Sequence, residues 1–349
     1  MEPVNSEVFP DLDTPDGFKI RLTRFNGGDK GPVLVVHGVS VCTGMFTLST
    51  VKENFASFLV KHGYDVWLLD WRASINMPLR KFTLDEVAEN DYPTAVKFIC
   101  EQTRKDSVQA IVHCIGSVSF FMSLASGRLP QVRCVACSQV ALHPITGLVM
   151  KLKARMRLGS ALAWTGMTHV SPLPDPDYPW FALLLRMMVN LVHHECRDTS
   201  CHRMTFMYGH LYPHFSLNVA THEAIDEQFG PCNMTTLAHL QQITNLGQLA
   251  KFDYGPAENL KRYGSAKSPS YLEKPENLKV PITLISGELN KCFIPDSTRK
   301  SFDWLCQMND PKLYTRRVIP NFGHFDNFVG AQANQYCYPA YLDQLERCP

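Results

Sequence analysis

The sequence lacks the features that point to several common classes of function. Its 349 residues carry 34 Lys and Arg against 33 Asp and Glu, a formal net charge of +1. A balance this even gives no support for binding to nucleic acid or to an anionic membrane surface. No Gly-x-Gly-x-x-Gly motif follows a predicted strand, so we expect no flavin or other dinucleotide cofactor.

Long apolar runs are also missing. The longest candidate, Trp180–Val192, contains Arg186 and is too short to span a membrane. The first residues, Met1–Glu7, are polar and acidic and lack the basic and apolar regions of a signal peptide. We therefore expect a cytoplasmic protein with no membrane span, whose twelve cysteines are reduced thiols rather than disulfides.

Strand and helix patterns alternate through the first 144 residues, after an arm of 16 residues that we expect to be loosely held. The predicted strands are Gly17–Phe25, Val33–Val36, Asp65–Leu69, Gln109–His113 and Val132–Val140. Helical spacing falls between them at Lys52–His62, Leu84–Thr103 and Val118–Leu124. This alternation predicts an α/β protein with a doubly wound, mostly parallel sheet.

The pattern changes after residue 144. From residue 145 to residue 277 the chain is rich in Met, His and aromatic residues and mostly helical in rhythm. Helices are predicted there over Lys151–Ala163, Trp180–Val192, Thr221–Phe229 and Asn233–Thr244. Strands resume at Val280–Ser286 and Leu313–Ile319, before a last helix over Ala331–Leu345. We predict a core of residues 1–144 and 278–349, with residues 145–277 inserted as a helical cap after the strand Val132–Val140, over the carboxyl edge of the sheet.

The stretch from Gln109 to Ser119 organises this prediction, because only Cys114–Ser117 joins a buried strand to a buried helix. So tight a turn forces its corner residue, Cys114, into a strained backbone and exposes its side chain at the sheet edge. We therefore expect Cys114 to be a nucleophile whose pKa is lowered by the helix N-terminus and a nearby histidine. Ser119, the rival nucleophile, falls inside the helix.

A nucleophile of this kind needs a base and an oxyanion hole. His324 follows the strand Leu313–Ile319 by a short loop, the place that the chain order of such enzymes gives to the base. The backbone amides of Val39 and Ile115 are the predicted oxyanion donors, since His37-Gly38 turns the chain after a buried strand.

The residue that orients the histidine departs from the usual pattern. The loop after Val280–Ser286 should carry an aspartate, and Asn290 stands there instead. An amide can orient an imidazole beside a thiolate, so we favour Asn290, with Glu288 as the second choice and Asp326 also in reach.

A group of His and Cys residues in the predicted cap resembles a set of metal ligands. It runs from His193–Cys196 through Cys201 and His202 to His210 and His214. These spacings match no standard zinc pattern, so we expect no metal here. Packing or lining of a substrate pocket is the favoured interpretation, with Met204, Phe206 and Tyr208.

These motifs resemble the α/β-hydrolases, and in particular the hydrolase-like domain fused to flavin oxidoreductases of the cholesterol-oxidase kind. The segments that carry the resemblance are Val112–Ser117, Ser138–Pro144, Cys201–Gly209, Thr221–His222, Gly287–Asn290 and Gly323–Asp326. Leu84–Ile99 also resembles the acid lipases. A cysteine at the elbow is similar to that of polyhydroxyalkanoate synthases, which transfer acyl groups from thioesters, and of dienelactone hydrolases, which open a lactone.

The residues leave three functions open. The first is a cysteine-dependent acyl-enzyme hydrolase of an apolar ester, lactone or thioester. The second is an acyltransferase that moves an acyl group, with a CoA thioester as one candidate donor, to an alcohol or amine. The third is non-catalytic binding of a small apolar ligand on the same scaffold.

Overall fold

The computed structural model describes residues 6–148, 150–151, 165–189 and 195–348, and an eight-stranded sheet forms its centre. The strand order is β1-β2-β4-β3-β5-β6-β9-β10. β1 and β4 each run antiparallel to β2, and the remaining neighbours are parallel. The strands are β1 (Ser6–Asp13), β2 (Lys19–Asn26), β3 (Pro32–Val36), β4 (Asp65–Asp70), β5 (Val108–His113), β6 (Val132–Ser138), β9 (Ile282–Gly287) and β10 (Tyr314–Ile319). This architecture confirms the predicted fold class.

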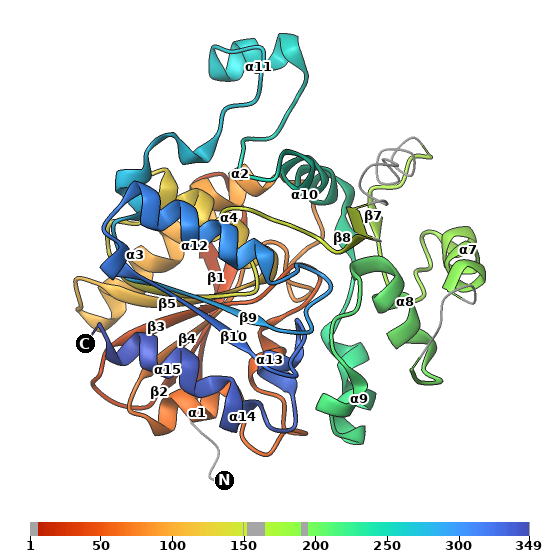
Figure 1. The fold of residues 1–349 in the computed structure, drawn as a ribbon. Helices are drawn as coiled ribbons and strands as arrows, with labels where there is room; N and C mark the ends of the chain where they lie inside the picture. The colour runs from red at the N-terminus through yellow and green to blue at the C-terminus, as the bar shows by residue number, and fades with distance from the viewer. Residues whose placement is uncertain (1–5, 149, 152–164, 190–194, 349) are drawn as a thin grey trace.

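Helices cover both faces of the sheet (Figure 1). One face carries α1 (Phe55–Lys61), α14 (Ala333–Tyr336) and α15 (Tyr338–Glu346), with α13 (Asp326–Val329) near the sheet edge. The other face carries α2 (Leu84–Glu86), the π-helical turn Val87–Asp91, α3 (Tyr92–Thr103), α4 (Cys114–Ala125) and α12 (Asp296–Met308). Because both faces are covered, every residue of β3, β4 and β5 is buried, as their mostly apolar sequences predict.

The expectation of a loosely held N-terminal arm is wrong for the part that the structure describes. Residues from Ser6 onward form β1, which pairs antiparallel with β2 at the edge of the sheet. Phe9 stacks on Trp67, with ring centroids 5.6 Å apart. The acids and Pro10 hide the strand in the sequence, yet an edge strand tolerates proline because one of its sides has no partner.

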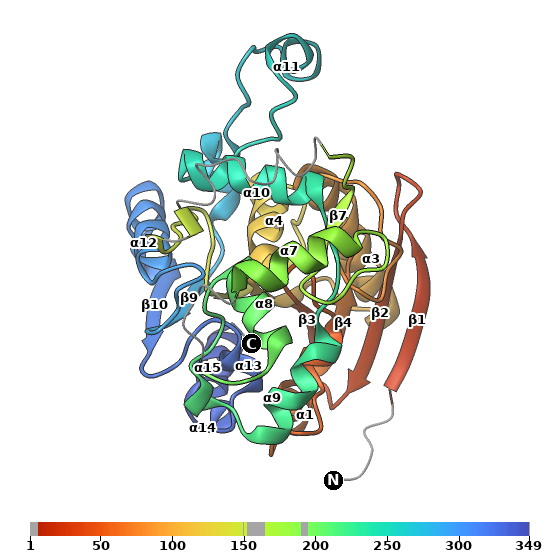
Figure 2. The same cartoon turned by 90° about the vertical axis from the view of Figure 1, so that its right-hand side faces the viewer.

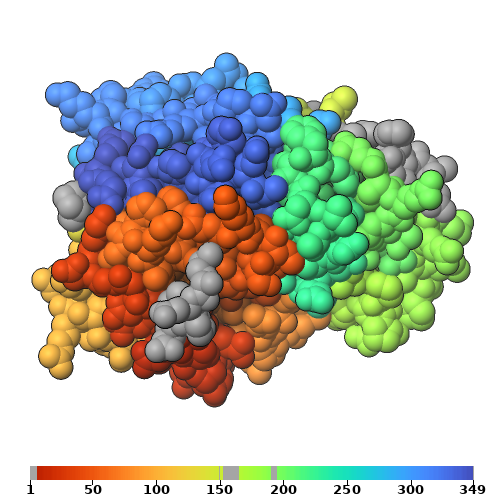
Figure 3. All heavy atoms as spheres, turned by 90° about the horizontal axis from the view of Figure 1, so that it is seen from below, coloured from red at the N-terminus to blue at the C-terminus, as the bar shows by residue number. Residues whose placement is uncertain are grey.

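The chain between β6 and β9, which contains the predicted cap, forms a lobe beside the sheet (Figures 2 and 3). This lobe is called the cap below. Its described elements are β7 (His169–Val170), α7 (Pro179–Val189), α8 (Thr199–Tyr208), the 3-10 turn His214–Ser216, α9 (Val219–Ala224), the 3-10 turn Ile225–Gln228, β8 (Cys232–Asn233), α10 (Met234–Leu246), α11 (Pro256–Tyr263) and the 3-10 turns Tyr271–Glu273 and Pro275–Leu278. Most of the predicted helix over residues 151–163, and the last residues of the one over 180–192, lie outside the described residues. Among those described, no helix is both long and apolar enough to cross a membrane.

Candidate active site

The chain passes from β5 into α4 without a loop, and Cys114 is the corner. Its φ angle is +56°, in the left-handed region that residues with a side chain rarely occupy. The helix begins at Cys114 itself, four residues before the predicted start at Val118. A Cβ atom at Gly116 would overlap the carbonyl oxygen of His37, so only glycine lets α4 pack this closely beside the end of β3.

Two backbone amides converge on the corner cysteine. The N–H groups of Ile115 and Val39 both point at the Cys114 sulfur, so they surround the place where a carbonyl oxygen would acquire charge. The indole Nε1 of Trp71 donates a hydrogen bond of 3.1 Å to the carbonyl of His37 and so holds the loop that carries Val39. The structure thus places both predicted oxyanion donors next to Cys114.

The thiol of Cys114 is not activated in the way that the sequence led us to expect. Burial raises its pKa to about 12, and the amides of Ile115 and Val39 only partly oppose this effect. The side chain is half-buried, and the space that it faces is lined mainly by apolar groups that cannot solvate a thiolate. The expected lowering of its pKa is therefore wrong, and Cys114 rests as a neutral thiol.

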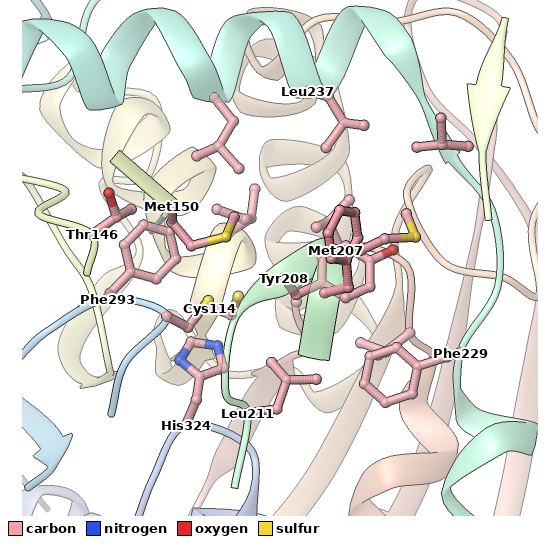
Figure 4. A pocket seen from close by; sticks show the side chains of 18 of the residues that line it. Cys114, Thr146, Met150, Met207, Tyr208, Leu211, Phe229, Leu237, Phe293 and His324 are labelled. Carbon is pink, nitrogen blue, oxygen red and sulfur yellow. The ribbon is translucent and has the colours of Figure 1, made fainter. Parts of the chain in front are cut away.

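His324 lies beside Cys114 (Figure 4). The sulfur and one ring nitrogen each of His113 and His324 lie within 4.8 Å of one another. Nε2 of His324 is buried and has no hydrogen-bond partner in the part of the chain that the structure describes. Burial also lowers the pKa of His324 to about 3, so its ring is neutral.

Asn290 reaches the other ring nitrogen of His324, and its own hydrogen bonds fix which way its amide points. The oxygen Oδ1 accepts the backbone N–H groups of Cys292, at 2.9 Å, and Phe293, at 3.1 Å. The amide nitrogen Nδ2 therefore faces Nδ1 of His324, at 3.1 Å. Since Nδ2 can only donate, Nδ1 must accept, and the proton of the neutral ring sits on Nε2.

Gln139 reinforces this arrangement. Its Oε1 accepts both Nδ2 of Asn290, at 2.8 Å, and the backbone N–H of Gly287, at 3.1 Å. The backbone donor fixes Oε1, so the amide of Asn290 cannot turn over without placing two acceptors or two donors together. Gln139 was missed in the sequence. Its place directly after β6, at the carboxyl edge of the sheet, is the signal that could have found it.

Glu288, the second choice as orienter, does not reach the histidine. Its side chain is exposed and accepts the backbone N–H of Asn321 at 3.2 Å, because the turn after β9 directs it outward. Asp326 is buried, but both of its oxygens accept the N–H of Gly323, at 2.8 and 3.1 Å. Burial raises the pKa of Asp326 to about 7. Both carboxylates are thus occupied elsewhere.

Two other side chains near the elbow have structural contacts. Ser119 lies inside α4, where its hydroxyl contacts the Tyr92 hydroxyl at 2.7 Å and the Ile115 carbonyl at 3.0 Å. His113 is buried, with Nδ1 3.0 Å from Ser138 Oγ and its ring 4.9 Å from that of His324. Ser119 is therefore held away from the site, whereas His113 forms part of its wall.

A cavity of about 350 Å³ opens above Cys114 and His324 (Figure 4). The cap supplies much of its lining, including Leu185 and Met188 from α7 and Leu237 and Leu240 from α10. Phe206 and Tyr208 line it as predicted, whereas Met204 is buried in the core instead. An apolar cavity of this size fits a ligand with a hydrocarbon chain or ring system.

Comparisons with known proteins agree with this fold. No protein-family model matches the sequence. A Schizosaccharomyces pombe protein named as a "probable lipase" is 26% identical, over 95% of this chain and 73% of its own. Human lysosomal acid lipase/cholesteryl ester hydrolase is 21% identical, over 96% of this chain and 86% of its own.

Among solved structures, an esterase of Pyrococcus furiosus aligns with a TM-score of 0.56 at 12% identity, covering 99% of this chain and 93% of its own. A monoacylglycerol lipase of Paleococcus ferrophilus aligns with a TM-score of 0.52 at 15% identity, over 95% of this chain and 100% of its own. The sheet order, the strained elbow and these similarities together show that the chain has the α/β-hydrolase fold.

Proposed function

We propose that the chain is a cysteine-dependent acyl hydrolase that acts on apolar esters, lactones or thioesters. The observation that carries the proposal is the convergence of the Val39 and Ile115 amides on the sulfur of Cys114, at the end of an apolar cavity. Lipases and esterases are the relatives whose sequences and structures are similar, which supports an ester as the substrate class. A thiol nucleophile requires a reducing compartment, which favours the cytoplasm.

The reaction follows from these positions. The sulfur attacks the carbonyl carbon, and the oxygen gains charge against the amides of Val39 and Ile115. The thiol proton passes through Nε2 of His324 to the leaving alkoxide or thiolate as its bond to the acyl carbon breaks. Water then attacks the thioester, releasing the acid and restoring the thiol. No cofactor is needed.

The orientation of the Asn290 amide, with its nitrogen toward His324, makes acylation of Cys114 slow. To accept the thiol proton, Nε2 must first be unprotonated, which requires the tautomer of His324 that carries the ring proton on Nδ1. That tautomer sets an N–H against Nδ2 of Asn290, which is 3.1 Å away. We therefore propose that acylation is slower than in an enzyme whose orienting residue is a carboxylate, and that activated substrates such as thioesters react best.

The same orientation of the Asn290 amide favours a second candidate function, which is the binding of an apolar ligand without catalysis. A neutral thiol beside an Nε2–H donor can hold the carbonyl of an apolar ligand without reacting with it. The lining of the cavity also favours a third outcome, transfer, because an apolar alcohol or amine can displace water from the acyl-enzyme.

Turnover assays with a series of p-nitrophenyl esters and acyl-CoA thioesters separate these functions. The proposal predicts release of free acid by the wild-type chain and its loss in Cys114→Ala and His324→Ala, with binding of the substrate retained. Equal turnover in wild type and Cys114→Ala would refute it. Product that appears mainly as the ester or amide of an added alcohol or amine would replace hydrolysis with transfer.

A further inference from the structure

The cap brings together four metal-ligating side chains that the proposed reaction does not use. One ligand atom each of Cys196, Cys201, His214 and His222 lies within 4.8 Å of the others. They come from the loop before α8, the first turn of α8, the 3-10 turn His214–Ser216, and α9. Two thiols and two imidazoles at this separation are the donor set of structural zinc sites.

The distances suit a tetrahedral ion. Nε2 of His214 lies 3.4 Å from Sγ of Cys201. Ligand atoms of a zinc ion bound by sulfur and nitrogen lie about 3.5 Å apart, since the bonds are about 2.3 and 2.0 Å long. The hydroxyl of Tyr212 also donates to Sγ of Cys201 at 3.3 Å, a contact that would stabilise the thiolate form.

His214 already has the support that a zinc-bound histidine requires. Its Nδ1 donates to Oε2 of Glu195 at 2.8 Å, which leaves Nε2 directed at Cys201. A carboxylate behind the imidazole fixes the tautomer and the ring orientation in metal sites. Oε1 of the same carboxylate accepts a hydrogen bond from Nε2 of His210 at 2.9 Å, so His210 contacts the supporting carboxylate and is not one of the four ligands.

A ring nitrogen of His222 lacks a hydrogen-bond partner among the described residues, which is a second, independent indication of a metal site. This nitrogen is Nε2, and it is buried. The ring centroid of His222 lies 5.0 Å from that of His214. A buried ring nitrogen without a partner is costly, and a bound cation would satisfy it.

We propose that Cys196, Cys201, His214 and His222 bind one structural zinc ion. Binding releases the two thiol protons, so two thiolates and two neutral imidazoles around the dication leave a site with no net charge. All four positions are filled by protein, which distinguishes it from a catalytic zinc site with an open position. The ion would tie α8 and α9 together, and Met207 and Tyr208 of α8 line the cavity above Cys114.

This proposal differs from the expectation of no metal in the cap. Four, twelve and seven residues separate the ligands in chain order, and only the last interval is longer than in zinc fingers. The group of possible ligands in the sequence included His202 and did not include His222. In the structure, Nε2 of His202 instead lies 2.8 Å from the carbonyl oxygen of Cys196. His193 and His194 lie outside the described residues.

The metal content of the full chain tests the site directly. The protein is purified in a non-chelating reductant, supplemented with zinc and desalted, and its zinc is measured by mass spectrometry. We expect one zinc per chain. The cobalt-loaded protein should show the visible bands of a tetrahedral ion together with a thiolate charge-transfer band. A desalted chain that holds no zinc and shows no such bands overturns the proposal, as does a Cys196–Cys201 disulfide in the protein as purified.

Variants identify the ligands. Cys201→Ser and His222→Asn should each lose the bound zinc, whereas Cys306→Ser on α12 and His62→Asn after α1 should keep it. Glu195→Gln should bind zinc about 10- to 100-fold more weakly. If the ligand variants fail to fold, a chelator titration of the wild type decides. Loss of zinc should lower the melting temperature, and an unchanged melting temperature on full removal contradicts a structural role.

Discussion

Nδ2 of Asn290 lies 3.1 Å from Nδ1 of His324, and it can only donate a hydrogen bond there. A carboxylate at this position would accept a hydrogen bond from the ring and stabilise a positive imidazolium. The amide does the reverse, because Cys292 and Phe293 hold its oxygen on the other side. Burial keeps the Cys114 thiol and the His324 ring neutral, and this contact does not offset it by stabilising a positive ring.

Replacing the amide by a carboxylate should speed the reaction. Asn290→Asp keeps the acceptor for the Cys292 and Phe293 amides and offers a second oxygen to Nδ1–H of His324. Because that oxygen also faces Oε1 of Gln139, the Gln139 amide must turn over and give up the Gly287 N–H. We expect the rate of acylation at pH 7 to rise about 100-fold. Stopped-flow release of p-nitrophenol measures it. Asn290→Ala, the control, removes the unfavourable donor without adding charge and should change the rate much less. A slower Asn290→Asp enzyme would show that the amide is the better partner.

The reactivity of Cys114 should climb with pH without levelling off near neutrality. Because burial raises the pKa of Cys114 to about 12, the thiolate fraction grows about tenfold for each pH unit between pH 7 and pH 10. Peptide-resolved mass spectrometry after timed iodoacetamide labelling follows this one cysteine among the twelve. A plateau below pH 8 would instead reveal a thiolate–imidazolium pair.

Two glycines near the elbow should respond differently to a methyl group. At Gly38, an added Cβ would lie 2.9 Å from the Cβ of Cys114 and 3.2 Å from its sulfur. Gly38→Ala should therefore displace the thiol and lower the acylation rate about 100-fold at little cost in stability. In Gly116→Ala the methyl group meets the fixed backbone of His37, so we expect a loss of about 3 kcal/mol in unfolding free energy.

Urea unfolding and ester turnover of both variants make this comparison. Equal losses of stability in the two variants would contradict the distinction between a reactive contact and a packing contact.

Acid should destabilise the fold through His324. Burial lowers its pKa from the usual 6.5 to about 3, so below pH 6.5 the unfolded chain binds a proton at this residue and the folded chain does not. Stability from this residue is complete above pH 6.5 and falls by up to about 1.4 kcal/mol per pH unit down to about pH 3. Urea unfolding of wild type and His324→Asn from pH 7 to pH 4 isolates the slope. Parallel curves for the two proteins would mean that the ring charges freely in the folded state.

The sequence predicts the sheet and the placement of the main side chains because those depend on local patterns. Short, mostly apolar runs predict β3, β4 and β5, and the short link after His113 places the elbow at Cys114. His324 and Asn290 follow strands, so the sheet brings them to the same edge as Cys114.

What the sequence could not supply depends on contacts between distant segments. The direction of the Asn290 amide is set by Gln139, which lies 151 positions away, and by the folding of its own loop. The pKa of Cys114 depends on the apolar cavity that the cap completes. The ligand cluster of the cap likewise needs α9 packed beside α8, which no spacing rule foresees.

Trapping the acyl group tests the central claim most directly. The chain is incubated with a short-chain acyl-CoA or a p-nitrophenyl ester, quenched in acid and analysed by intact mass and peptide mapping. We predict one acyl group per chain, attached to Cys114, removed by hydroxylamine and absent from Cys114→Ala and His324→Ala. An unmodified chain, or an adduct that persists in Cys114→Ala, would contradict the account.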